Sequence, residues 1–333
     1  GPNGIACDGP QTVTTEAEIL IDNDVILEGF GNLTVDGNET HRVFSIGTDI
    51  TAELRRLSVT RGSAAAGSGG AILSSGNATL VDIRVTESTA LRFGGGIANF
   101  GEMRLLDSQV SANSAGENGG GVFNTLTLAM TDTTVSGNSA TLAGGGVGNT
   151  GSSLLIDRCT LSGNQAIQNG GGIANSNVLM IANSTLSGNS ATSSGGGIRN
   201  ESIMTMQHVT ASGNTAMAGS AIGNAGVIMT MSGSVIDGEC AGTAVGSSGY
   251  NIESPGDTCS LDQMSDVSGI SASALGLGPL RDNGGATETH ALMGGSAALD
   301  RIPPGDCEVD EDQRGVARPQ GDQCDVGAFE LEP

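Results

Sequence analysis

Residues 170–194 read GGGIANSNVLMIANSTLSGNSATSS, and closely related stretches precede and follow them along the middle of the chain. Each repeat places an apolar anchor directly after its glycines, and these anchors are Ile72, Ile97, Val122, Val147, Ile173, Ile198 and Ile222. They follow one another at intervals of 25, 25, 25, 26, 25 and 24 residues. Self-similarity at such a period is typical of solenoid proteins, whose stacked units share one continuous core.

Two asparagine positions recur in phase with the anchors. The first set follows each anchor by two residues and consists of Asn99, Asn124, Asn149, Asn175, Asn200 and Asn224. The second set lies mostly within Ser-Gly-Asn and consists of Asn113, Asn138, Asn164, Asn189 and Asn214. Because neighbouring strands lie about 4.8 Å apart, we expect equivalent amides to hydrogen-bond in ladders along the stack.

Each period holds three short apolar segments separated by glycine and asparagine. In one repeat these are residues 171–175, 178–181 and 184–187. Segments of three to five residues suit strands and are too short for helices, and Gly and Asn suit corners that need positive φ. The sequence therefore predicts an all-β fold, a right-handed parallel β-helix with about 25 residues and three strands per coil, capped at both ends.

The prolines agree with this prediction. A coil strand needs its N–H groups for pairing, which proline would break, and none of the eight prolines lies between residues 11 and 254. Leucine-rich repeats and left-handed hexapeptide helices are the competing solenoids. The first lacks support because no LxxLxL pattern occurs, and the second because the period is not a multiple of six. The long, variable coil favours the right-handed form.

The repeat divides the chain into three regions. Residues 1–61 carry weaker strand patterns and are expected to form an N-terminal cap and irregular first coils. Residues 62–239 contain the regular coils. Residues 240–333 are rich in proline and aspartate and hold four of the six cysteines, so we expect a disulfide-stapled C-terminal cap region.

Composition limits the partners of this chain. It has no lysine, and its 13 arginines face 36 acidic residues, which gives a net charge of −23 and a pI of about 4.1. Such a surface repels nucleic acid and anionic membranes, and it disfavours anionic substrates such as polygalacturonate. No stretch is long and apolar enough to span a membrane.

The cysteines indicate an oxidising compartment. Cys240 and Cys259 lie 19 residues apart, and Cys307 and Cys324 lie 17 apart, so we interpret them as two local disulfides. Zinc is the alternative, although no CxxC motif or histidine cluster accompanies them. Cys159 falls in a repeat strand and is expected to be a buried thiol, whereas Cys7 is either free or paired.

Two parts of the sequence resemble known bacterial proteins. The coils, with their Gly-Gly-x-Ile and Ser-Gly-Asn marks, resemble the parallel β-helix of polymorphic outer-membrane proteins. The C-terminal region contains, in order, residues 277–280 (LGPL), 282–285 (DNGG), 289–292 (THAL), 295–300 (GSAALD), 312–315 (DQRG), 318–319 (RP) and 324–330 (CDVGAFE). This order resembles the terminal region of choice-of-anchor Q domain proteins. The resemblance implies a right-handed β-helix, export and a place at the cell surface, with no agreed enzymatic role.

Two acidic groups are candidate calcium sites. Asp82, Asp107, Asp132 and Asp157 lie in similar phase, so outward carboxylates would stack about 5 Å apart and favour a bound cation. The alternative is that each acid caps a corner through an Asx-turn. The second group consists of Asp306, Glu308, Asp310 and Asp312, where alternating carboxylates suit Ca²⁺ but lack the EF-hand spacing. Its alternative is a solvated loop whose acids pair with Arg314 and Arg318.

Three functions are compatible with the sequence. We favour a non-catalytic, secreted or cell-surface rod that is structural or adhesive, binds a surface glycan or protein, and self-associates through coil ends. The first alternative is a polysaccharide lyase or glycoside hydrolase, whose candidate catalytic residues are Asp132, Asp157, Arg158, Arg199 and His208. Scattered basic groups and the lack of tryptophan speak against it. The second alternative is a carbohydrate-binding module.

Overall fold

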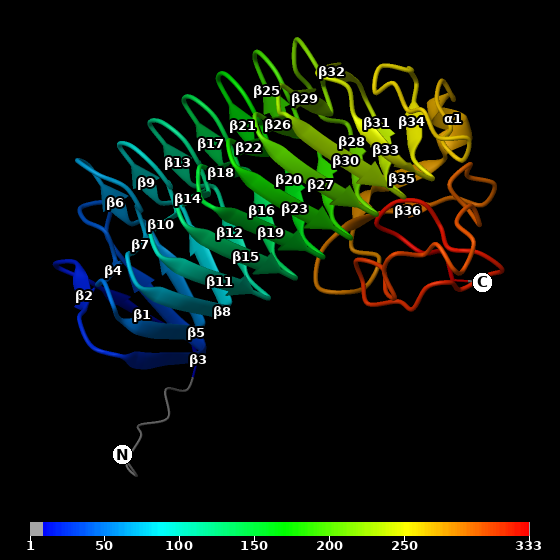
Figure 1. Cartoon of the computed structure of the whole chain (residues 1–333). Helices are drawn as coiled ribbons and strands as arrows, with labels where there is room; N and C mark the ends of the chain where they lie inside the picture. The colour runs from blue at the N-terminus through cyan, green and yellow to red at the C-terminus, as the bar shows by residue number, and fades with distance from the viewer. Residues whose placement is uncertain (1–8, 333) are drawn as a thin grey trace.

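The protein is a β-solenoid whose parallel strands stack coil upon coil (Figure 1). The computed structural model describes residues 9–332. Anchors of successive coils lie directly beside one another, as Ile97 pairs with Ile72 on one side and Val122 on the other. The expected all-β parallel solenoid with coils of about 25 residues is confirmed.

Three sheets run along the solenoid. The ten-stranded sheet consists of β2 (Ile19–Ile21), β4 (Phe44–Ile46), β7 (Ile72–Ser74), β10 (Ile97–Asn99), β14 (Val122–Asn124), β18 (Val147–Asn149), β22 (Ile173–Asn175), β26 (Ile198–Asn200), β29 (Ile222–Asn224) and β32 (Cys240–Gly242). The six-stranded sheet consists of β6 (Ser63–Ala64), β9 (Thr89–Ala90), β13 (Ser114–Ala115), β17 (Ser139–Ala140), β21 (Gln165–Ala166) and β25 (Ser190–Ala191).

The third sheet has 18 strands in two parallel rows. In chain order they are β1 (Gln11–Thr14), β3 (Val25–Asp36), β5 (Thr51–Thr60), β8 (Asn77–Thr86), β11 (Glu102–Leu106), β12 (Gln109–Ser111), β15 (Thr127–Thr131), β16 (Thr134–Ser136), β19 (Ser153–Asp157), β20 (Thr160–Ser162), β23 (Val178–Ala182), β24 (Thr185–Ser187), β27 (Ile203–Gln207), β28 (Thr210–Ser212), β30 (Ile228–Ser232), β31 (Val235–Asp237), β33 (Gly246–Gly249) and β34 (Ile252–Ser254). Strands β3, β5 and β8 span both rows, whereas from β11 onward each coil contributes two separate strands.

A positive-φ residue makes the bend between the two rows. In the regular coils this residue is Asp107, Asp132, Arg158, Asn183 or His208, with φ between 43° and 51°. Such a conformation is uncommon for residues other than glycine, although Asn, Asp and His adopt it more readily. Asp82, Asp107 and Asp132 thus lie at corners, as the second interpretation of the repeated aspartates expects, whereas Asp157 lies in a strand.

The triple glycines form another corner at which a side chain has no room. Gly170 has a φ of 63°, and a Cβ there would lie 2.3 Å from the Ile173 carbonyl oxygen. A Cβ on Gly171 would lie 2.5 Å from the carbonyl oxygen of Gly196 in the next coil. The repeated glycines are thus required both by backbone conformation and by the close approach of stacked coils.

Aliphatic side chains fill a single narrow core. On β23, Leu179 and Ile181 are buried while Met180 between them is exposed, as the alternation of a strand requires. One cluster of buried residues extends from Ile21 in the first coils to Cys259 at the other end. The continuity of this core explains why so few aromatic residues are needed.

Both expected asparagine ladders are present and buried. Successive members of the first set donate from Nδ2 to Oδ1 of the next coil at 2.8–2.9 Å. Members of the second set do the same at 2.9–3.0 Å. Each ladder satisfies polar groups inside the solenoid, where an unpaired amide would be costly.

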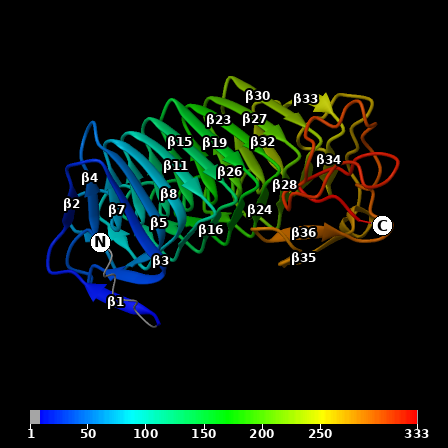
Figure 2. The same ribbon diagram turned by 90° about the horizontal axis from the view of Figure 1, so that it is seen from below.

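The C-terminal segment folds back along the side of the solenoid, where Figures 1 and 2 show it in orange and red. It contains α1 (Ala272–Leu275) and an antiparallel pair, β35 (Leu277–Arg281) and β36 (Thr289–Leu292). A second hydrophobic cluster, which includes Leu275, Leu292 and Phe329, packs it against Val235 of the solenoid. The segment therefore covers part of one sheet face in addition to following the last coil.

Candidate functional site

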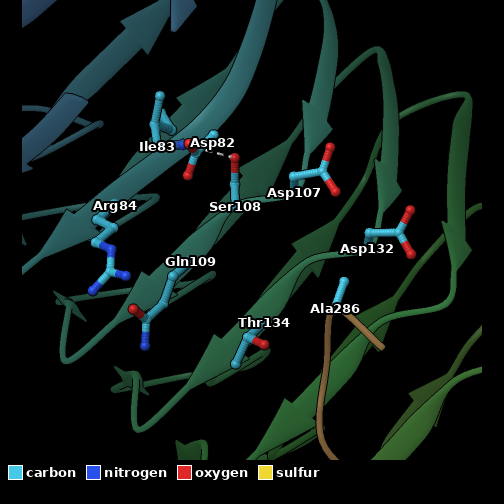
Figure 3. Close-up of a pocket in the computed structure, with 9 residues that line it drawn as sticks. All are labelled: Asp82, Ile83, Arg84, Asp107, Ser108, Gln109, Asp132, Thr134 and Ala286. Carbon is cyan, nitrogen blue, oxygen red and sulfur yellow. Dashed lines mark hydrogen bonds between the residues drawn. The ribbon is translucent and has the colours of Figure 1, made fainter. Parts of the chain in front are cut away.

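Asp82, Asp107 and Asp132 occupy equivalent corners of three successive coils (Figure 3). Asp157 does not continue this stack, because it pairs with Thr131 and the next corner is Arg158. The 26-residue coil places its additional residue before β19, since β14 and β18 are offset by 25 residues but β15 and β19 by 26. The predicted stack of four carboxylates is therefore corrected to three, followed by a guanidinium.

Arg158 forms ion pairs with the two acids closest to it. Its Nε and Nη2 donate to the two carboxylate oxygens of Asp132 at 2.9 and 2.7 Å, and its Nη1 donates to Asp157 at 3.1 Å. The hydrogen bond to Asp132 raises the pKa of Arg158. Burial raises the pKa of Asp157 despite the nearby guanidinium. The pKa of Asp107 is also raised, first by burial and then by the charges of Asp132 and Asp82.

A groove runs between this row of corners and the loop before β36. Two neighbouring hollows of about 280 and 410 Å³ share Gln109, Thr134 and Ala286 (Figure 3). The first also contains the three corner aspartates, and the second is bordered by Asp282 and Glu288. The groove is therefore polar and acidic, and its chemistry suits neutral or cationic ligands better than anionic ones.

The remaining candidate catalytic residues lie elsewhere. Arg199 is on β26 of the ten-stranded sheet, where it contacts Glu201 at 3.4 Å and Ser194 at 3.3 Å. His208 is 1% exposed at a corner two coils beyond Arg158, and burial lowers its pKa to about 3. Asp132, Asp157 and Arg158 thus meet, whereas Arg199 and His208 do not join them.

A third pocket lies beside His208, with a volume of about 480 Å³. It is lined by His208, Ser232, Gly233, Ser248, Tyr250, Ser265, Ile302, Gly305, Asp306 and Glu308. Sequence reasoning selected His208, Asp306 and Glu308 separately but missed that they share a pocket. Their separation of about 100 residues hides this proximity, because the repeat pattern does not predict where the C-terminal segment docks.

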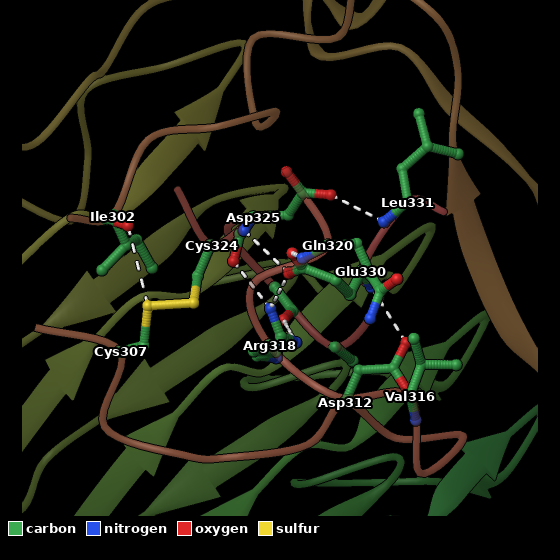
Figure 4. A network of polar contacts seen from close by, with 12 residues as sticks. Ile302, Cys307, Asp312, Val316, Arg318, Gln320, Cys324, Asp325, Glu330 and Leu331 are labelled. Carbon is green, nitrogen blue, oxygen red and sulfur yellow. Dashed lines mark hydrogen bonds and ion pairs between the residues drawn. A yellow bond between two sulfur atoms is a disulfide. The ribbon is translucent and has the colours of Figure 1, made fainter. Parts of the chain in front are cut away.

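The second candidate calcium group does not converge. Asp312 is fully buried and accepts hydrogen bonds from the backbone N–H groups of Arg314, Val316 and Glu330 at 2.8–3.0 Å (Figure 4). Asp306 and Glu308 instead line the pocket beside His208, and the backbone carbonyl of Asp310 accepts from Arg318. Within residues 9–332, no three His, Cys, Asp or Glu side chains are placed to hold a metal ion. Calcium binding stays a prediction.

The arginines of the C-terminal motif support the fold. Arg314 pairs with Asp312 at 2.8 Å, as expected, whereas Arg318 pairs with Glu330 at 3.0 Å (Figure 4). Arg318 also donates to the backbone carbonyls of Asp325 and Gly327. A buried guanidinium with several acceptors fixes the loop around it, so these motif residues hold the segment together.

Both predicted disulfides are present. Cys240 bonds to Cys259 and Cys307 to Cys324, with Cα–Cα distances of 4.8 and 6.2 Å. Cys159 is a buried free thiol, as expected, and burial raises its pKa to about 12. Cys7 lies outside the described residues. The zinc alternative is thereby wrong for the two bonded pairs.

Comparison with family models, curated proteins and solved structures finds no match to this chain. Among residues 9–332, no helix has the length and apolarity needed to cross a membrane. Membership of the choice-of-anchor Q domain proteins stays a prediction.

Proposed function

We propose that this protein is a non-catalytic extracellular rod with a structural or adhesive role at a bacterial cell surface. The observation that carries this proposal is that the candidate catalytic side chains are paired, buried or far from one another. Arg158 is held between Asp132 and Asp157, His208 is buried, and Arg199 lies on a different sheet. A lyase or glycoside hydrolase needs acid and base groups that converge on one substrate.

The architecture supports a mechanical or presenting role. One continuous core and two buried asparagine ladders connect successive coils, so the coils support one another along the whole solenoid. Two disulfides are typical of proteins from oxidising compartments. The resemblance of the C-terminal motifs to exported surface proteins supports the same location.

Self-association through the first coil is part of the proposal. Leu20 on β2 is 63% exposed there, and Ile26 and Phe30 on β3 are 63% and 73% exposed. Outer strands offer unpaired N–H and C=O groups to a second chain. Light scattering should detect particles that grow with protein concentration, and the Ile26→Asp variant should remain smaller. Equal particle sizes for the parent and the Ile26→Asp variant would contradict self-association through the first coil.

A polysaccharide assay separates the rod from the enzyme alternative. The chain is incubated with neutral and anionic polysaccharides in the presence of Ca²⁺, while reducing ends and unsaturated-sugar absorbance are followed. We expect no product. Beads coated with the protein should attach to glycan-coated surfaces, and the Arg158→Gln variant should attach equally well. Product formation that disappears in Arg158→Gln or Asp132→Asn would overturn the proposal.

A further inference from the structure

A glycine creates the recess beside His208. Gly233 occupies the corner that follows His208 in the next coil and has a φ of 53°. A Cβ on this glycine would lie 3.0 Å from Cε1 and 3.1 Å from Nε2 of His208. The lack of a side chain there leaves the histidine ring at the wall of a pocket that would otherwise be filled.

The C-terminal segment supplies the opposite wall. The stretch between Ile302 and Glu308 is fixed by the disulfide between Cys307 and Cys324, which Figure 4 shows together with Ile302. Glu308 accepts a hydrogen bond from Ser232 and another of 2.9 Å from Gln207, so it is attached to the last coils. The pocket therefore lies between the solenoid and a disulfide-fixed loop.

Two carboxylates and an aromatic ring face the same space. Asp306 accepts a hydrogen bond of 2.7 Å from the Tyr250 hydroxyl, and Ser248 and Ser265 add hydroxyl groups to the lining. Both acids are exposed at the protein surface and can accept further hydrogen bonds. Tyr250 is the single tyrosine of the chain, which has no tryptophan.

His208 forms part of the wall of this pocket. It is 1% exposed, and within the described residues its Nδ1 is buried without a hydrogen-bond partner. The ring atoms nearest the recess left by Gly233 are Cε1 and Nε2, so a ligand in the pocket would meet this edge of the imidazole.

We propose that this pocket binds a neutral, hydroxyl-rich ligand, namely a single sugar residue at the end of a glycan. The carboxylates of Asp306 and Glu308 accept from sugar hydroxyls, and the Tyr250 ring packs against the apolar face of the sugar. Their negative charges disfavour uronic acids and sialic acids. The volume of about 480 Å³ lies within the usual range for small-ligand sites. This inference rests on the proposed function, because it specifies the ligand class of an adhesive rod.

Tyrosine fluorescence gives a direct test, since all tyrosine emission comes from Tyr250. The folded full chain is titrated with methyl glycosides of glucose, galactose, mannose and N-acetylglucosamine, and with methyl glucuronide as the anionic probe. We expect at least one neutral glycoside to change the emission saturably. Glu308→Gln and Asp306→Asn should each weaken binding about tenfold, because each removes a charge-assisted hydrogen bond. Asp282→Asn, in the separate groove, is the control and should bind as the parent does.

Calorimetry with Tyr250→Ala provides a second measurement that does not depend on fluorescence, and binding should again fall about tenfold. Circular dichroism checks that each variant keeps the fold. Absence of binding by every neutral glycoside, or tighter binding of the glucuronide, would overturn the sugar site. The polysaccharide assay reports on the proposed function separately, because product formation there overturns the non-catalytic role whatever the glycoside titration shows.

Discussion

Gln313 accepts a hydrogen bond of 2.6 Å from the Thr185 hydroxyl, although 128 residues separate them in the sequence. Its Nε2 donates to the hydroxyls of Thr160 and Thr287, each at 2.8 Å. Thr160 and Thr185 are outward-facing residues of neighbouring coils, yet both are fully buried. Thr210 in the next coil is also buried and accepts from the backbone N–H of Ala328. A row of threonines on the solenoid is thus the surface on which the C-terminal segment docks.

Replacing Gln313 should loosen this docking without melting the coils. Gln313→Leu removes four side-chain hydrogen bonds and leaves the buried Thr185 hydroxyl unsatisfied, at a cost of about 1–3 kcal/mol. Hydrogen exchange should become faster in residues 277–332 and stay unchanged in the coils that precede Asp132. Gln109→Leu, at a half-buried position in the groove, is the matched control. Equal acceleration along the whole chain would contradict a local docking role.

The repeating features of the fold can be predicted from the sequence, because residues one period apart lie in contact in neighbouring coils. The ladder through Asn149 and the corners of positive φ follow from a spacing of about 25 residues. A single additional residue, however, was enough to shift Asp157 out of the corner that Arg158 occupies.

Contacts outside the repeat were not predictable from spacing. Thr160 and Thr185 have the pattern of solvent-facing strand residues, and nothing in the period indicates that Gln313 covers them. The pocket beside His208 was missed for the same reason, because its far wall comes from the non-repeating segment. The sequence did single out His208 and the acids near residue 306 as candidate site residues, but as members of different sites.

The first asparagine ladder should be sensitive to a single truncation. Asn149 accepts from Asn124 at 2.8 Å and donates to Asn175 at 2.8 Å. Asn149→Ala leaves both neighbours with weakened or missing partners inside the solenoid, and we expect a loss of about 1–3 kcal/mol in the free energy of unfolding. Urea unfolding followed by circular dichroism measures this loss. Asn77→Ala, at an exposed strand position, should change stability by less than about 0.5 kcal/mol.

His208 should make the protein sensitive to acid. Burial lowers its pKa to about 3 from the ordinary 6.5, so between these values the unfolded chain binds more protons than the folded one. Stability is therefore retained above pH 6.5 and falls as the pH drops towards 3, by an amount on the order of a few kcal/mol.

The matched variant is His208→Asn, because Asn183 occupies the same corner one coil earlier with positive φ. Urea unfolding at several pH values should show that the variant loses less stability than the parent between pH 6.5 and pH 4. The difference between the two proteins cancels the contributions of other titrating groups. Parallel pH profiles would mean that His208 is not held neutral by burial.

Tyr250 should titrate above the ordinary tyrosine range. Its hydrogen bond to Asp306 raises its pKa, and burial and the carboxylate charge act in the same direction. Because the chain has one tyrosine and no tryptophan, tyrosinate absorbance reports on this group alone. Asp306→Asn should lower the pKa of Tyr250 towards the ordinary value of about 10, since the charged acceptor is lost. Glu308→Gln leaves that hydrogen bond in place and is the control, with circular dichroism verifying the fold at each pH. Identical midpoints for the parent and Asp306→Asn would show that the contact between Tyr250 and Asp306 does not form in solution.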